Sequence, residues 1–148
     1  PAFPVLLAEA RDCLAKIDAL LAEPALSEDA FSGYVEQNGR FHGLIAEMAD
    51  SPLVARQVAR AAQLPFASPN GFLGVQALDA SGRDLLIAAQ HQHRGVLEAI
   101  AHREGGRAEA LMREHARIAQ HNLRGALQSR EGLERVPGAS LIRRRAVR

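Results

Sequence analysis

Cysteines and long apolar runs are what this chain of 148 residues lacks most clearly. Its one cysteine, Cys13, cannot support a disulfide framework or a thiolate zinc site, because either needs several cysteines. A reducing compartment, the cytoplasm, is therefore the expected location. No apolar run approaches the roughly 18 residues that a membrane span requires, and the first residues lack the basic-then-apolar order of a signal peptide. We expect neither membrane insertion nor secretion.

Several catalytic signatures are also missing. No glutamate has a histidine three residues later, which argues against a carboxylate di-iron bundle, and the His-Glu-x-x-His motif of zinc proteases is absent. The chain contains no G-x-S-x-G nucleophile elbow, phosphate loop or dinucleotide fingerprint. Cys13 lies on a surface pattern of its predicted helix with no recognisable partner, so a thiol nucleophile is not expected.

Charge of one sign is also lacking, since 18 Lys+Arg stand against 17 Asp+Glu, but four arginines crowd the last six residues. Without these four, the body of the chain has 14 basic and 17 acidic residues. A mildly acidic body offers no broad electrostatic surface for a phosphate backbone, so we expect this chain alone to bind DNA weakly. Residues 131–148 are predicted to form an irregular basic tail.

Helical periodicity runs through nearly the whole chain, and no segment alternates like a strand. Ser27 and Ser51 have the positions of helix N-caps, and Glu104-Gly105-Gly106 is predicted to be a break. Residues 64–82 are punctuated by proline and glycine and are predicted to be a loop or short helical turns. The expected fold is all-α, an antiparallel bundle of about six helices. Predicted helices cover about residues 4–22, 27–49, 51–63, 82–102 and 107–130.

The six histidines separate by helical phase. His42 follows Asn38 by one turn on an otherwise apolar stripe of residues 27–49. His93 shares its face with apolar residues of the fourth predicted helix, and His115 does so on the fifth. The remaining three fall on polar faces or at a helix end and are not expected in the core: His91, His102 and His121.

Three helices thus each present one imidazole to what should be a shared core. A single histidine on an apolar face is ordinarily a hydrogen-bonded core residue. Burying three without partners would cost several kcal/mol, and one divalent cation would satisfy all three. Periodicity alone leaves both interpretations open, a hydrogen-bonded core and a metal site.

Three segments carry a resemblance to a known family. They are NGRFHGLIAEMADSPLV, HQHRGVLEAI, and ALMREHARIAQHNL, whose His115 follows His93 by 22 residues. Over roughly residues 5–128 the chain resembles the FCD domain, the effector-binding and dimerisation module of the FadR subgroup of GntR-family bacterial transcription regulators. The family pattern is Asp-x3-His on one helix and a histidine on each of two later helices. Its four places here are Asn38, His42, His93 and His115, with Asn38 standing where the pattern usually has aspartate.

The resemblance implies that residues 1–148 form one FCD-like ligand-binding and dimerisation domain. It also implies a divalent metal, with zinc, nickel or manganese as candidates, and a small organic acid bound on or near that metal. The winged helix-turn-helix of the family is not in this sequence, so we expect DNA binding to belong to a part outside it. An amide at position 38 brings no charge, so the metal should attract an anion. Arg40, Arg56 and Arg60 are candidate second contacts for a carboxylate.

Two functional hypotheses follow. The first is an effector-sensing domain in which a small carboxylate biases the helix packing and thereby the attached DNA-binding domains of a homodimer. The alternative is a metal-dependent helical-bundle enzyme, because three histidines with open coordination positions also describe catalytic zinc. The lack of an inward carboxylate to act as a base weighs against the enzyme, since Glu47 and Glu98 fall on polar faces.

Overall fold

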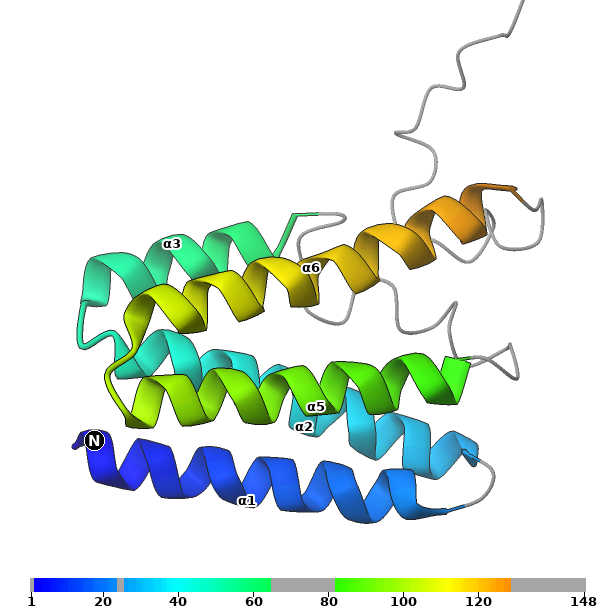
Figure 1. Cartoon of the computed structure of the whole chain (residues 1–148), viewed down its shortest axis with the longest axis horizontal. Coiled ribbons are helices and arrows are strands. Elements are labelled where there is room, and N and C mark those ends of the chain that lie inside the picture. The colour runs from blue at the N-terminus through cyan, green and yellow to red at the C-terminus, as the bar shows by residue number, and fades with distance from the viewer. Residues whose placement is uncertain (1, 24–25, 65–81, 129–148) are drawn as a thin grey trace, which may run out of the picture.

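The computed structural model describes residues 2–23, 26–64 and 82–128, and for residues 119 and 121–128 it describes only the backbone. All regular structure in these ranges is helical, which confirms the all-α prediction. The helices run nearly side by side, and α5 lies between α1 and α6 (Figure 1). The loop predicted at 64–82 lies outside the described residues except for Leu64 and Gly82, and the tail at 131–148 lies wholly outside them. The helices are α1 (Phe3–Ala22), α2 (Glu28–Met48), α3 (Pro52–Ala62), α5 (Gly82–Ala101) and α6 (Gly105–Gln128).

Both predicted N-caps are confirmed. Ser27 Oγ accepts a hydrogen bond of 3.1 Å from the backbone N–H of Ala30 at the start of α2. Ser51 Oγ accepts one of 3.4 Å from Val54 N–H, and Pro52 follows at the first position of α3. Each serine oxygen satisfies an N–H that has no partner within the helix, so these two residues define where α2 and α3 begin.

The predicted break between the last two helices is confirmed, but it lies at residues 102–104, two residues before the predicted Glu104-Gly105-Gly106. Arg103 adopts a left-handed conformation with φ of 59°, and α6 already begins at Gly105. The N–H of Glu104 bonds to the carbonyl of Ala99 at 2.8 Å and that of Arg103 to Ile100 at 3.0 Å. This is the Schellman pattern, which ends a helix by satisfying its last carbonyls and usually has glycine where Arg103 stands.

The core lies where α1, α2 and α5 meet. Along α1 it is lined by residues spaced three or four apart, and Ile17 is fully buried. Tyr34, Phe41 and Leu44 fill it from α2, and Leu86 and Leu97 from α5. Burial of this apolar surface is the main force that holds the three helices together.

The prediction that Cys13 lies on a surface face of its helix is wrong. Cys13 belongs to the buried face of α1 and is 4% exposed, because it stands three residues after Ala10 and four before Ile17. Burial raises the pKa of the Cys13 thiol, so the side chain behaves as a small apolar residue. No described helix is long and apolar enough to span a membrane.

Candidate metal centre

The three histidines selected by helical phase come together in the structure. His93 is 0% exposed on α5, His42 is half-buried on α2, and His115 is half-buried on α6. Asn38 is 2% exposed and lies one turn before His42 on the same face of α2. Helical periodicity therefore predicted correctly which residues of three helices point inward.

The imidazole rings form one cluster. Ring centroids lie 4.5 Å apart for His93 and His115, 5.2 Å for His42 and His93, and 5.4 Å for His42 and His115. Phe41 covers the cluster from the core side, with its ring centroid 4.8 Å from that of His93. The site thus has an apolar wall.

One pair of ring nitrogens in the cluster has the spacing of metal ligands. Nε2 of His93 and Nε2 of His115 lie 3.2 Å apart, and one ring nitrogen from each histidine lies within 4.8 Å of the others. Two nitrogens on a tetrahedral metal with bonds of about 2.0–2.1 Å lie about 3.3–3.4 Å apart. The pair on α5 and α6 already has this spacing, and binding would draw His42 inward.

His42 supplies an independent indication of a ligand. Its Nε2 is buried and has no hydrogen-bond partner among the described residues. A buried polar atom without a partner costs about 1–3 kcal/mol. A cation bound between the three rings would remove this penalty.

All three imidazoles are neutral at neutral pH. Burial, assisted by the nearby His115, lowers the pKa of His42 to about 4. Burial, together with His115 and His42, lowers the pKa of His93 well below its ordinary value, and burial lowers that of His115 in the same direction. Neutral imidazole is the form that binds a metal, so no proton has to leave before these residues can act as ligands.

Two of the three histidines expected outside the core lie at the surface, where phase analysis placed them. His91 and His102 are exposed, and His102 Nδ1 lies 2.9 Å from the carbonyl oxygen of Glu98 at the end of α5. The side chain of His121 lies outside the described part of the chain. Among the described residues no glutamate joins the histidine cluster, and Glu47 and Glu98 form surface ion pairs with Arg40 and Arg107.

The three candidate arginines are exposed. Arg40 pairs with Glu9 of α1 at 2.6 Å and with Glu47 at 3.2 Å, so its charge is shared between two carboxylates. Arg56 and Arg60 lie on α3 and form no ion pair with a described residue.

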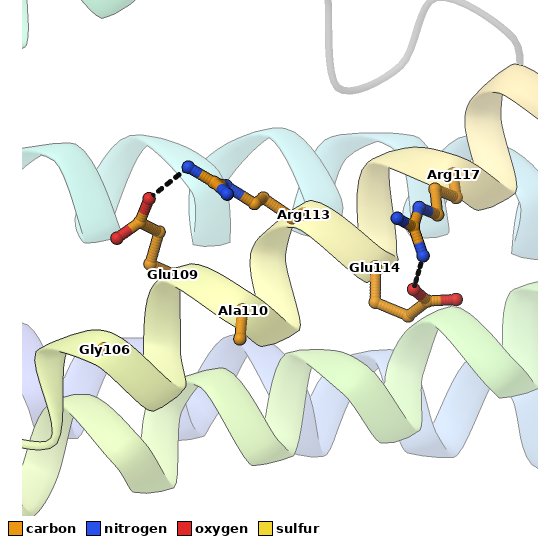
Figure 2. A pocket seen from close by; sticks show the side chains of 6 residues that line it. All are labelled: Gly106, Glu109, Ala110, Arg113, Glu114 and Arg117. Carbon is orange, nitrogen blue, oxygen red and sulfur yellow. Dashed lines mark hydrogen bonds and ion pairs between the residues drawn. The ribbon is translucent and has the colours of Figure 1, made fainter.

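A pocket of about 330 Å³ lies on α6 but belongs to another face of that helix. Figure 2 shows its charged side chains paired along the helix, Arg113 with Glu109 and Arg117 with Glu114. None of the clustered histidines lines it. The residues that line it are Gly106, Glu109, Ala110, Arg113, Glu114 and Arg117.

Two glutamines of α5 contact the cluster, and sequence reasoning gave neither a role. Gln90 Oε1 lies 3.2 Å from Nδ1 of His93, and Gln92 Oε1 lies 3.2 Å from Nδ1 of His115. The signal for Gln90 was its place three residues before His93 on the same buried face. Gln92 is next to His93 in the sequence, but its side chain contacts His115 on α6. The spacing of residues within α5 could not predict this contact between two helices.

The described helices form a bundle that brings three histidines from three helices to one site. The family model of the FCD domain matches residues 4–118, which include all three histidines. The chain belongs to the FCD domain family, the effector-binding domain of GntR-family regulators. A search of curated proteins finds no match.

Proposed function

We propose that this domain binds a divalent metal ion through His42, His93 and His115, with Asn38 as the fourth ligand from the protein. The observation that carries the proposal is the convergence of three imidazoles from three helices, one fully buried and two half-buried, and the buried Nε2 of His42 has no hydrogen-bond partner among the described residues. A bound cation would supply a fixed positive charge in a site of low dielectric. The match of residues 4–118 to an effector-binding domain family supports the proposal.

The donor set favours some metals over others. Imidazole nitrogen suits zinc and nickel, whereas manganese prefers carboxylate and water oxygens. No carboxylate joins the histidine cluster among the described residues. We therefore expect zinc or nickel to bind more tightly than manganese.

Metal titration with matched histidine variants tests this part of the proposal. The wild-type chain, first treated with a chelator, should take up one equivalent of Zn²⁺ or Ni²⁺ and gain thermal stability. His93→Ala should lose both effects, because it removes a buried ligand of the cluster, whereas His91→Ala should keep both. Anomalous scattering from a metal-soaked crystal should place the ion at the three imidazoles. Uptake by His93→Ala equal to the wild type, or an ion located elsewhere, would refute the site.

The same site would recruit a small mono- or dicarboxylate as the effector. Three imidazoles and an amide are all neutral, so the metal would keep its full charge of +2 and attract an anion. Arg56 and Arg60 are the better candidates for a second contact with the carboxylate, because Arg40 is already paired with Glu9 and Glu47. Binding of the acid would bias the helix packing and thereby the DNA affinity of an attached winged helix-turn-helix.

Calorimetry with acetate and malonate on the metal-loaded protein tests this second part. Both acids should bind the loaded protein and lose most of their affinity when the metal is stripped. Asn38→Asp should hold the metal more tightly and the acids more weakly, because the added negative charge offsets part of the attraction. Acids that bind equally well without metal, or more tightly to Asn38→Asp, would show that metal charge does not recruit them.

The alternative of a metal-dependent enzyme has no support from the family assignment, because FCD is a regulatory ligand-binding domain. A cytoplasmic homodimer that binds DNA through a domain outside these 148 residues is the context we propose for the sensor.

A further inference from the structure

Gln90 is a buried polar side chain whose orientation is fixed from a distant part of the chain. It is 2% exposed on α5, and its Nε2 donates to two acceptors on α1. These are the carbonyl oxygen of Leu14, at 2.9 Å, and Oδ1 of Asp18, at 2.7 Å. Neither atom can donate a proton, so the amide nitrogen of Gln90 must face α1 and its oxygen must face the other way.

The oxygen of Gln90 in turn fixes the proton of His93. Oε1 lies 3.2 Å from Nδ1 of His93 and can only accept, so Nδ1 carries the hydrogen. A neutral imidazole carries a hydrogen on only one of its two ring nitrogens. With that hydrogen on Nδ1, the free lone pair of His93 is on Nε2. That is the nitrogen 3.2 Å from Nε2 of His115 and directed into the histidine cluster.

We propose that Gln90, held by Leu14 and Asp18 of α1, is a positioning residue that keeps His93 in the Nδ1–H form and so presents its Nε2 to the metal. The inference rests on the proposed metal site and deepens it, because it adds a dependence on α1, which contributes no ligand. Partners of metal-ligating histidines orient the ring and fix its tautomer in many metal sites. Here the partner is a neutral amide.

Asp18 strengthens this link between α1 and α5. Its carboxylate bonds to Gln90 and also to Arg94, which lies one turn after Gln90 on α5. A shift of α1 along α5 would break both bonds and release the oxygen of Gln90 from Nδ1 of His93. By linkage, metal binding and the packing of α1 on α5 should stabilise each other.

Nitrogen-15 NMR of the metal-free full chain tests the proposal directly, because two-bond correlations show which ring nitrogen carries the hydrogen. His93 should be in the Nδ1–H form in the wild type. Gln90→Leu, which keeps the bulk and removes the amide, should shift the tautomer population of His93 toward Nε2–H. A wild-type His93 with its proton on Nε2, or an unchanged population in Gln90→Leu, would overturn the assignment.

Cobalt binding, measured by competition with a chelator, gives the second readout. Gln90→Leu should bind Co²⁺ about tenfold or more weakly than the wild type. Asp18→Ala leaves Gln90 with only Leu14 as an acceptor and should lose about fivefold. Asp12→Ala is the matched control, since among the described residues Asp12 forms its ion pair with Lys16 on the exposed side of α1, and it should bind cobalt as the wild type does.

These measurements separate the two proposals. If Gln90→Leu does not fold, Asp18→Ala carries the test, because Asp18 lies at the surface with its side chain 38% exposed. Asp18→Ala with wild-type cobalt affinity and a wild-type His93 tautomer would refute the contribution of Asp18, and a wild-type His93 with its proton on Nε2 would refute the role of Gln90. A wild-type chain that takes up no cobalt would refute the metal site instead, while the tautomer of His93 in the metal-free protein would still decide whether Gln90 positions it.

Discussion

Acid should destabilise the metal-free domain through the histidine cluster. The pKa of His42 falls from an ordinary value of 6.5 to about 4 on folding, because its ring is buried beside another imidazole. A lowered pKa means that the folded state prefers neutral His42, so the associated stability is fully present above about pH 6.5. This stability is lost as the pH falls from 6.5 toward 4, because in that range His42 is protonated in the unfolded chain but not in the folded chain.

The size of the effect follows from the two pKa values. Between pH 8 and pH 5, His42 alone should lower the free energy of unfolding by about 2 kcal/mol. His93 and His115 shift in the same direction and add to the loss. A domain of this size has a total stability on the order of 5–15 kcal/mol, so the loss is a large part of it.

Urea denaturation, followed by circular dichroism with a chelator present at pH 8, 6 and 5, measures the loss. His42→Leu should show a decrease about 2 kcal/mol smaller than that of the wild type over this range, because it removes one of the protonating groups. His91→Gln should keep the wild-type decrease, since its side chain lies exposed outside the cluster. Equal decreases in the wild type and in His42→Leu would refute the reasoning.

Four further predictions concern packing, assembly and DNA binding. Gly95→Val should cost about 1–3 kcal/mol of stability in thermal denaturation, because a Cβ at position 95 would lie 3.3 Å from the side chain of Leu111 on α6. Gly43→Val should show no such clash, since no described atom outside the adjacent backbone of α2 lies within 4 Å of a Cβ at position 43. Ser27→Ala should lower the free energy of unfolding by about 1 kcal/mol through loss of the cap on α2, and an unchanged midpoint would contradict that role. Sedimentation at tens of micromolar should show a homodimer, and the isolated chain should retain no DNA duplex in a sequence-specific way at physiological salt.

Much of the site was readable from the sequence because it depends on the phase of single helices. A helix has one period, so the two-residue step from His91 to His93 necessarily moves a side chain from one face to another. The same rule could have placed Cys13 in the core, since it completes the spacing of Ala10 and Ile17. The position of the break before α6 was not readable, because the left-handed residue is Arg103 rather than the glycines that follow it.

What the sequence could not predict are the contacts between helices. Gln90 was on the correct face, but its acceptors Leu14 and Asp18 lie more than 70 residues earlier, and only the packing of α1 on α5 brings them to it. The cluster also depends on this packing for its chemistry. Burial lowers the pKa of His42 and His93, so their imidazoles stay neutral. The amide oxygen of Gln90 accepts from Nδ1 of His93 and so leaves the free lone pair on Nε2. Protons and metal ions compete for the same lone pairs, so a core that disfavours protonated imidazole leaves those lone pairs free for a metal.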